Sequence, residues 1–527
     1  MTDPTSDAPA RLEFGTAGIR GPVGDGPGHL NVSSVRVVAD GLALHLLATD
    51  PAARRRGVVV GHDARHWSYE FAHVVADRLV RAGIDVLVFD AAVPTPLVAR
   101  AVSQLGAGAG VVVTASHNPA TDNGLKVYGP DGVLLSAPAD GQVAAAVARV
   151  ADGEELVQRA AEPGAVEHLG GADGDDPVAG AFVRDALELA GPGTGSTPFV
   201  ATTALHGVGG SLLGRVLTEA GVDHVTVAEQ LAPDPDFPTV PFPNPEEPHV
   251  MDLVLQLAGQ RGAEVALAND PDADRVAVAV RRSDGTFWTL TGDEVGALLA
   301  HEVLRTGRDV AGALVATTLV SSRLVPAMAA DAGVEAVVTP TGFKWLCRAT
   351  FDRPGSVQLL AYEEALGYAV GPGTTDKDGI ATALVVVRAL ERLRDQPDQP
   401  LAEALGDLFD QLARRFGAYR TSNGSVRLEV PAGPVVEQLR GTRTVAGRAV
   451  VTEDEPVPGA VRWLLDDDTR VVLRGSGTEP KAKFYVEARV PVAGDDVDGA
   501  WTSSARRATE VAAEVESLLR GAAVPSG

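Results

Sequence analysis

Residues 110–119 read Gly110-Val111-Val112-Val113-Thr114-Ala115-Ser116-His117-Asn118-Pro119. The valines form an apolar run that predicts a short buried strand. Small and polar residues then break the run, and Pro119 prevents an ordinary continuation of the strand. Ser116 therefore lies at the exit of a buried strand, beside His117 and a few residues before Lys126. This placement is typical of a nucleophile with proton-transfer partners, although Ser, Asn and Pro are also ordinary residues of a turn.

A second polar loop follows the apolar run of residues 265–268 and reads Asp270-Pro271-Asp272-Ala273-Asp274-Arg275. Carboxylates at alternate positions of an extended loop can face one side, where they repel one another unless a cation lies among them. Oxygen ligands of this kind suit Mg²⁺. The spacing resembles the start of a calcium-binding loop. Such a loop needs a glutamate at its twelfth position, but here that position is Arg281. The alternative is an acidic surface turn, and the buried strand before the loop favours the metal site.

A third loop lies near the C-terminus, after the strand-like residues 469–473, and reads Arg474-Gly475-Ser476-Gly477-Thr478-Glu479-Pro480-Lys481. Hydroxyl groups, glycine amides and an arginine are the groups that bind a phosphate. A plain hairpin turn is the alternative, because short Gly/Ser loops are common.

The composition indicates a multidomain protein with an acidic surface. At 527 residues the chain is long enough for about three to four domains, and 45% hydrophobic residues suffice for buried cores. A net charge of −25 argues against nucleic acid or an anionic membrane surface as a partner, so local Arg and Lys side chains must bind any phosphate. Cys347 is the single cysteine, which excludes an intrachain disulfide.

The N-terminal residues 1–7 are polar and acidic, unlike a signal peptide. No uncharged apolar run approaches the ~20 residues of a membrane span. We therefore expect a cytoplasmic protein.

Three successive parts of the chain repeat one pattern of short apolar strands separated by helix-length segments. The strands are expected at 58–60, 86–89 and 111–113, then at 199–201, 224–227 and 265–267, and then at 313–316, 336–338 and 357–360. This alternation predicts parallel α/β layers, and ligands bind at the carboxyl ends of such strands.

The last part of the chain differs, with antiparallel strands expected at 425–430 and 461–465 and an amphipathic helix over Arg506–Leu519. The Gly/Asp-rich residues 170–177 predict a linker or an exposed loop.

Together these loops resemble those of the α-D-phosphohexomutase superfamily, the phosphoglucomutases and phosphomannomutases, and in particular its long bacterial phospho-sugar mutases. Further segments carry the resemblance: 14–21 is similar to the N-terminal signature, 340–344 and 362–368 to sugar-recognition loops, and 376–379 to a loop near the site. The resemblance implies three mixed α/β domains of similar topology plus a C-terminal α+β domain, with the active site in a central cleft. The expected boundaries are 1–168, 177–290, 291–418 and 419–527.

The resemblance also implies a mechanism. Ser116 would carry a phosphoryl group, and one Mg²⁺ would be bound by Ser116, Asp270, Asp272 and Asp274. His117 and Lys126 would manage the proton of the attacking sugar hydroxyl, and Arg275 would bind the phosphoserine. The phosphoserine would phosphorylate a sugar monophosphate, and the resulting 1,6-bisphosphate would return its other phosphate to the serine. A sugar 1,6-bisphosphate is therefore the expected activator.

The resemblance assigns substrate binding to residues of several loops: Arg20, Thr341, Gly342, Glu363, Lys377, Arg474, Ser476, Gly477 and Thr478. His206 and Gly207 are similar to another family loop, for which a structural role is an equal alternative. Three positions depart from the family pattern, where serine, proline and arginine are usual: Ala365, Gly475 and Thr375. All three bear on which sugar is preferred.

The expected function is the interconversion of hexose 1-phosphate and 6-phosphate, with mannose or glucose as the sugar. A phosphopentomutase of the same fold is the first alternative. A metal-dependent serine phosphatase would share the serine and the acidic loop but would not need a separate loop for a second phosphate. A non-catalytic sugar-phosphate-binding protein would not need the serine and the full carboxylate set together. The expected partners are small sugar phosphates, without nucleic acid or membrane.

Overall fold

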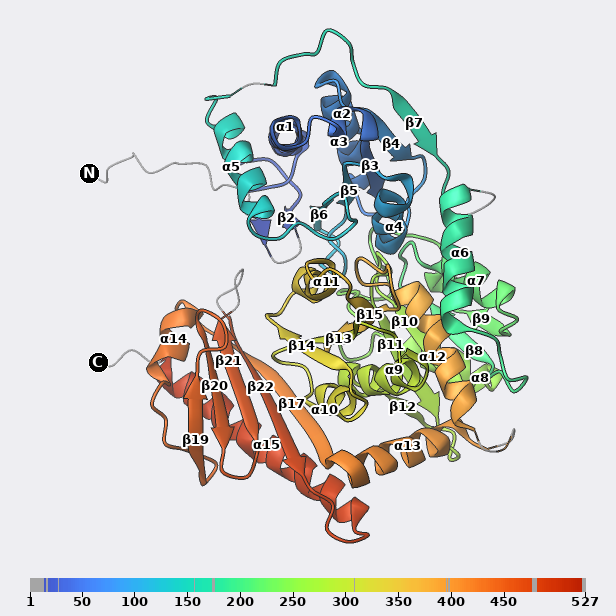
Figure 1. The fold of residues 1–527 in the computed structure, drawn as a ribbon, viewed down its shortest axis with the longest axis vertical. Helices are drawn as coiled ribbons and strands as arrows, with labels where there is room; N and C mark the ends of the chain where they lie inside the picture. Colours follow the sequence, from blue (N-terminus) through green and yellow to red (C-terminus); the bar gives the residue numbers. More distant parts are fainter. Residues whose placement is uncertain are drawn as a thin grey trace. The chain divides into compact units, whose positions relative to one another are not determined.

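The computed structural model describes residues 14–523 apart from residues 16–17, 27, 156, 173–175, 308, 395, 397–398 and 476–480. The chain forms two compact units, of which unit 1 contains residues up to 316 together with 342–402. Unit 2 contains residues 317–341 and those from 403 onward. Figure 1 shows the elements coloured along the sequence.

The first sheet of unit 1 has the order β1-β2-β6-β5-β3-β4-β7. Its strands are β1 (Phe14–Gly15), β2 (Gly18–Pro22), β3 (Val58–His62), β4 (Val86–Phe89), β5 (Ala109–Val113), β6 (Asp122–Tyr128) and β7 (Val166–Leu169). The accompanying helices are α1 (Val32–Thr49), α2 (Ala53–Arg56), α3 (Ser68–Arg81), α4 (Thr95–Leu105) and α5 (Ala139–Ala151). The side chains of Val58 and Val60 pack in one core with α1 and α3, whereas Gly61 faces Val98 of α4, so helices cover both faces.

The second sheet has the order β12-β11-β10-β8-β9. Its strands are β8 (Val200–Thr203), β9 (His224–Thr226), β10 (Val265–Asn269), β11 (Val276–Arg281) and β12 (Phe287–Thr289). The accompanying helices are α6 (Pro177–Ala190), α7 (Gly210–Glu219), the 3₁₀ turn η1 (Ala228–Gln230) and α8 (Asp252–Arg261). The acidic loop 270–275 connects β10 to β11.

The third group of elements in unit 1 contains β15 (Val357–Glu363), β16 (Gly367–Val370), α9 (Gly292–Gly307), α11 (Phe343–Phe351) and α12 (Gly379–Leu393). Strand β13 (Ala313–Thr318) leads from unit 1 into unit 2 and lies next to β15 in its sheet. Helix α12 is almost wholly buried, because it contacts α6, α7 and α9 as well as β10 and β11. Helix α12 therefore joins the second sheet and its helices to the third group of elements in one core.

Unit 2 is built on a sheet with the order β17-β22-β21-β20-β19-β18, in which all neighbours are antiparallel. Its strands are β17 (Ala418–Arg427), β18 (Thr444–Val445), β19 (Arg448–Asp454), β20 (Ala460–Leu465), β21 (Arg470–Gly475) and β22 (Lys481–Val490). Other elements are α10 (Leu324–Asp331), β14 (Glu335–Thr339), α13 (Leu401–Phe416, which begins in unit 1), α14 (Ala432–Gln438) and α15 (Val497–Ala522). Helix α15 lies along β17 and β22 (Figure 1).

The structure confirms the three mixed α/β parts and the different C-terminal part, and it corrects three details. The sheets are parallel only in part, because β6, β11 and β16 return antiparallel to their neighbours. Strand β17 ends at Arg427 instead of Val430. Helix α15 begins at Val497 instead of Arg506, because the side chain of Asp496 accepts the Gly499 amide hydrogen and caps the helix. The predicted domain boundaries stay predictions.

Among the described residues, α1 alone is long and apolar enough to cross a membrane by length and composition. Its contacts are those of a core helix. It packs against α3 and α5, and its Asp40 accepts two hydrogen bonds of 2.7 Å from Arg78 of α3.

A buried carboxylate ties α12 to the segment before β8. Glu391 has no exposed side-chain surface, and its Oε1 accepts five hydrogen bonds from the loop of residues 194–197. Its Oε2 accepts a hydrogen bond of 2.7 Å from Arg388. Burial alone would raise the pKa of Glu391, but the hydrogen bonds from Arg388 and Thr194 hold that pKa below its usual value. The carboxylate is therefore charged in the folded protein.

Replacing this carboxylate is expected to destabilise the protein in a pH-dependent way. Glu391→Gln keeps the shape but removes the charge that Arg388 faces, at a cost of about 1.5–3 kcal/mol. Because the folded pKa is lowered, the stabilisation is fully present above the unfolded value of about 4.3 and is lost as pH falls through the folded pKa. Melting temperatures from pH 3 to 8 should thus differ most at neutral pH and converge in acid. Glu403→Gln, at an exposed position of α13, is the control. A melting curve of Glu391→Gln that overlays that of the wild type at neutral pH would contradict the stabilising role of the Glu391 carboxylate.

Candidate active site

Ser116 lies in the loop between β5 and β6 in a strained backbone conformation. Its φ is +53°, in the left-handed region that non-glycine residues rarely adopt. The Ser116 amide donates to Oγ1 of Thr114 at 2.8 Å, and Oγ of Ser116 donates to Oδ2 of Asp270 at 2.8 Å. The loop therefore presents the serine hydroxyl directly to the acidic loop.

Asp270, Asp272 and Asp274 form a buried cluster, each at most 1% exposed. One carboxylate oxygen of each lies within 4.8 Å of those of the other two. Oδ1 of Asp272 and Oδ1 of Asp274 are buried without a hydrogen-bond partner. Buried polar groups normally have partners, so these oxygens fit a hard divalent cation. With Oγ of Ser116 beside Asp270, the donor set is suited to Mg²⁺.

Burial and mutual repulsion act on this cluster unequally. Burial, followed by the charge of Asp274, raises the pKa of Asp270 and the pKa of Asp272. Burial would also raise the pKa of Asp274, but the nearby cations Lys126, Lys377 and Arg275 outweigh it and hold that pKa well below its usual value.

Lys126 on β6 is the main counter-charge of the cluster. Its Nζ lies 2.6 Å from Oδ2 of Asp272 and 2.6 Å from Oδ2 of Asp274. Burial would lower the pKa of Lys126, but these two carboxylates raise it above its usual value. Lys126 is thus a protonated cation that neutralises the charge of these carboxylates, and its role with the proton of the attacking hydroxyl stays a prediction.

His117 has the opposite character. Its Nδ1 lies 3.1 Å from Oγ of Ser116. Burial, aided by the charges of Arg275 and Arg20, holds the pKa of His117 well below its usual value. A neutral imidazole beside the serine can accept a proton from a hydroxyl.

Arg275 closes the acidic loop. Its backbone N–H donates to Oδ1 of Asp270 at 2.9 Å, and its Nη1 lies 2.9 Å from Oε2 of Glu246. Burial would lower the pKa of Arg275, but Glu246 and Glu363 raise it. Arg275 is therefore a permanent positive charge beside the aspartates.

Lys377 adds a third cation, with Nζ 3.2 Å from Oδ2 of Asp274. Gly367 makes room for it, because a Cβ at that position would lie 2.3 Å from Cδ of Lys377. Burial raises the pKa of Glu363, which ends β15, against the charges of Lys377 and Arg275. Lys377 and Glu363 thus belong to the third part of unit 1 and lie around the aspartates of the second part.

Other predicted residues lie in different places. Arg20 of β2 is at the serine loop, where its Nη1 donates to Oδ1 of Asn118 at 3.3 Å. Gly342 precedes α11 with φ +116°. Thr341 and Arg474 belong to unit 2, where Nη2 of Arg474 donates to the Tyr485 hydroxyl at 3.0 Å. The predicted phosphate-binding residues Ser476, Gly477 and Thr478 lie outside the described residues.

The His206–Gly207 loop packs under the acidic loop. Nε2 of His206 lies 2.8 Å from Oγ1 of Thr239, and a Cβ on Gly207 would lie 2.3 Å from Cα of Pro271. This arrangement favours the structural interpretation.

Sequence reasoning missed two residues that hold the site. Thr95, the first residue of α4, donates from Oγ1 to Oδ2 of Asp272 at 2.8 Å and from its amide to the Asp272 carbonyl at 2.9 Å. Arg65 donates to the backbone of the serine loop. Both follow apolar strands, at the same sheet edge as Ser116, and that position was the available signal.

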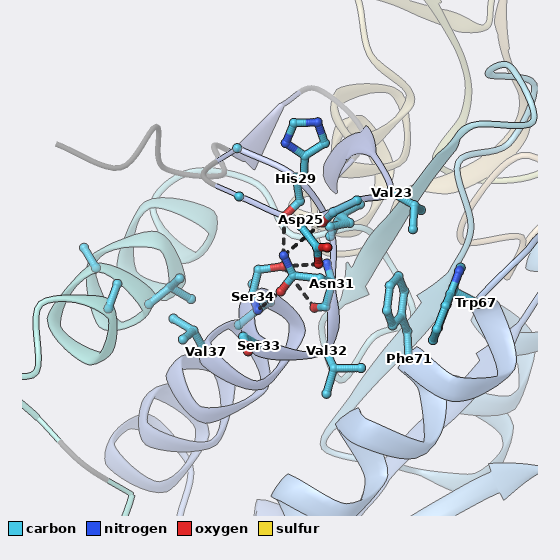
Figure 2. A pocket seen from close by; sticks show the side chains of 18 of the residues that line it. Val23, Asp25, His29, Asn31, Val32, Ser33, Ser34, Val37, Trp67 and Phe71 are labelled. Carbon is cyan, nitrogen blue, oxygen red and sulfur yellow. Dashed lines mark hydrogen bonds between the residues drawn. The ribbon is translucent and has the colours of Figure 1, made fainter. Parts of the chain in front are cut away.

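A cavity of about 930 Å³ in unit 1 is separate from this site. Figure 2 shows its side chains, which come from the loop after β2, from α1 and from α5, with Trp67 and Phe71 at one side. None of its lining residues is a predicted site residue.

Comparison with known proteins identifies the family. Residues 11–154, 187–285 and 291–412 match the models for phosphoglucomutase/phosphomannomutase α/β/α domains I, II and III. A Schizosaccharomyces pombe protein named "Probable phosphoribomutase" is 34% identical, with 91% of this chain and 87% of the relative covered. A Haemophilus influenzae protein named "Probable phosphomannomutase" is 35% identical, with coverages of 87% and 93%.

Solved structures agree on the fold. A phosphoglucomutase/phosphomannomutase family protein from Burkholderia thailandensis superposes with a TM-score of 0.73 at 22% identity, covering 98% of this chain and 99% of its own. With three domain models matched in order and the serine and aspartate loops in contact, this chain belongs to the phosphoglucomutase/phosphomannomutase family of the α-D-phosphohexomutase superfamily and is an enzyme of the mutase class.

Proposed function

We propose that this enzyme interconverts two phosphate esters of one sugar through a phosphoserine at Ser116. In one ester the phosphate is on the 1-hydroxyl, and in the other it is on the terminal hydroxyl, which is the 6-hydroxyl of a hexose. The contact that carries the proposal is the 2.8 Å hydrogen bond from Oγ of Ser116 to Asp270, in a cluster with two unpartnered carboxylate oxygens. A nucleophilic hydroxyl beside a hard-cation site is what phosphoryl transfer requires.

A Mg²⁺ ion bound by Asp270, Asp272, Asp274 and the phosphoserine would supply Lewis-acid stabilisation of the transferring phosphoryl group. The protein's own residues do the rest. His117 accepts the proton of the attacking sugar hydroxyl, because its imidazole is neutral and next to Ser116. Arg275 binds the phosphoserine oxygens, and Lys126 holds the carboxylates in place.

The phosphate that is not reacting is bound by Arg474 with Ser476, Gly477 and Thr478, aided by Lys377, and Arg20 also contacts the substrate. Glu363 binds sugar hydroxyls beside the Thr341–Gly342 turn. The bisphosphorylated intermediate turns over and returns its other phosphate to Ser116, so a catalytic amount of sugar 1,6-bisphosphate activates the enzyme.

Hexose phosphates of glucose and mannose are the proposed substrates, and pentose phosphates are the second candidate. The second candidate is favoured by the relative named as a phosphoribomutase, which is about as similar as the one named as a phosphomannomutase. A serine phosphatase of the same site would not need priming by a bisphosphate, so stimulation by glucose 1,6-bisphosphate separates mutase from phosphatase.

Removing the nucleophile should abolish turnover without unfolding the protein. Ser116→Ala is expected to lower kcat by about 10⁴-fold or more, because the phosphoryl acceptor is gone. Intact-mass analysis should find a phosphate adduct after incubation with glucose 1,6-bisphosphate in the wild type only. Ser103→Ala, at an exposed position of α4, is the control. Mutase activity that persists in Ser116→Ala would refute the assignment.

The acidic cluster should bind Mg²⁺ in a way that melting temperature reports. At a Mg²⁺ concentration of 100 times Kd, the folded protein gains about 2.7 kcal/mol. The rise in melting temperature on adding Mg²⁺ should be large in the wild type and in the surface control Asp498→Asn, and small in Asp272→Asn. Activity should fall on chelation and return with Mg²⁺. An equal rise in all three proteins would show that the cluster binds no cation.

Ala365 should make the enzyme permissive between sugars. A hydroxyl at this position could add one hydrogen bond of about 0.5–1.5 kcal/mol, which is at most about tenfold in specificity. Ala365→Ser should therefore widen the ratio of kcat/KM for glucose 1-phosphate over mannose 1-phosphate, whereas Ala365→Gly should not. Ribose 1-phosphate belongs in the same panel. An unchanged ratio in Ala365→Ser would leave specificity to Glu363 and the backbone.

A further inference from the structure

Arg65 lies in the loop after β3 and is almost completely buried, with 1% of its side chain exposed. Its guanidinium donates to four backbone carbonyls of the serine loop. Nη2 donates to Ser116 at 2.5 Å and to Asn118 at 2.6 Å, and Nη1 donates to Pro119 at 2.8 Å and to Asp122 at 3.1 Å. The loop backbone therefore curls around one planar group.

Neighbouring residues fix the guanidinium itself. Its Nε lies 3.3 Å from Oδ2 of Asp63, which is equally buried. Oδ1 of Asp63 accepts from the Arg65 amide at 3.0 Å and from Oγ of Ser68 at 2.6 Å. The Phe237 ring, from the second part of unit 1, lies 5.0 Å from the guanidinium carbon.

These contacts use the four terminal N–H groups of Arg65, which all face backbone carbonyls. The fifth donor, the Nε–H group, makes no hydrogen bond and lies buried beside Oδ2 of Asp63. No terminal N–H group remains for a phosphate, so Arg65 does not bind substrate in this arrangement. Its effect on the reaction must pass through the loop.

The loop needs such a support. Ser116 is held at φ +53°, a conformation that persists only where the surroundings enforce it. The direct support from within the loop is the Thr114 side chain, which accepts the Ser116 amide hydrogen. The Ser116 carbonyl on the other side of the residue is held by Arg65. Together they fix the peptide groups on both sides of the nucleophile.

We propose that Arg65 is the positioning residue of the nucleophile: it sets the curvature of residues 116–122 so that Oγ of Ser116 points at Asp270. The proposal rests on the proposed mutase function. Lysine keeps the charge but is a single point donor that cannot span four carbonyls. Arg65→Lys should therefore lower kcat by about 10²-fold, the cost of displacing a reacting group by about 1 Å. KM for the sugar 1-phosphate should change little, because Arg65 does not touch substrate.

The experiment compares Arg65→Lys and Arg65→Ala with Arg78→Lys, all primed with glucose 1,6-bisphosphate and normalised to folded protein. Arg78 is the matched control, since it pairs with Asp40 in the same part of unit 1 and makes no contact with the serine loop among its described hydrogen bonds. Melting temperature should fall in all three variants, but kcat should fall only in the Arg65 variants.

Chemical rescue separates positioning from general destabilisation. Methylguanidinium should restore kcat of Arg65→Ala, because a planar donor can re-enter the space between the carbonyls, whereas methylammonium at equal concentration should not. The rate at which glucose 1,6-bisphosphate phosphorylates Ser116, followed by intact mass, should show the same pattern.

A wild-type kcat in folded Arg65→Lys would overturn the positioning role alone. Equal loss of kcat in Arg78→Lys, or Arg65→Ala that methylguanidinium does not rescue, would overturn it too by assigning the effect to stability. Absence of mutase turnover in the wild type would instead overturn the proposed function, and the positioning role with it.

Discussion

The burial of three carboxylates side by side is the constraint on which the rest of unit 1 depends. Taking charges out of water is costly unless opposite charges accompany them. Here Lys126 comes from β6, Lys377 from the segment before α12 and Arg275 from the acidic loop itself. The cluster is therefore stable only where all three parts of unit 1 meet, and the need for charge balance fixes the contacts between them.

The same constraint explains how a strongly acidic protein can bind an anion. The chain as a whole carries −25 charges, so its surface field repels a phosphate. Around the serine, however, buried cations gather because the aspartates need them. A cation bound by the two unpartnered aspartate oxygens would neutralise part of the carboxylate charge. The neighbouring lysine and arginine side chains would then attract a phosphoryl group more strongly. The buried cations around the serine therefore matter more for binding a phosphate than the net negative charge of the whole chain.

Much of this could be predicted from the sequence because the signals are local. The apolar runs at 58–60, 86–89 and 111–113 lie in β3, β4 and β5, and the aspartate loop follows β10 as expected. Strand direction could not be predicted in this way, since an apolar run fixes burial and leaves orientation open. Residues 123–126 therefore proved to belong to antiparallel β6.

The site residues also differ in how far local sequence signals reveal them. Ser116 and the aspartates stand out because their chemistry is unusual after a buried strand. Thr95 and Arg65 also follow apolar strands, but their partners, Asp272 and residues 116–122, are distant in sequence, so that position alone does not give their roles. Their roles require tertiary contacts.

Gly367 limits how residues 362–368, the proposed sugar-recognition loop, can change. Its missing side chain leaves the space that Lys377 fills, and an alanine there would collide with the lysine stem. Directed evolution of substrate preference therefore has a fixed boundary at the first residue of β16, which libraries should preserve.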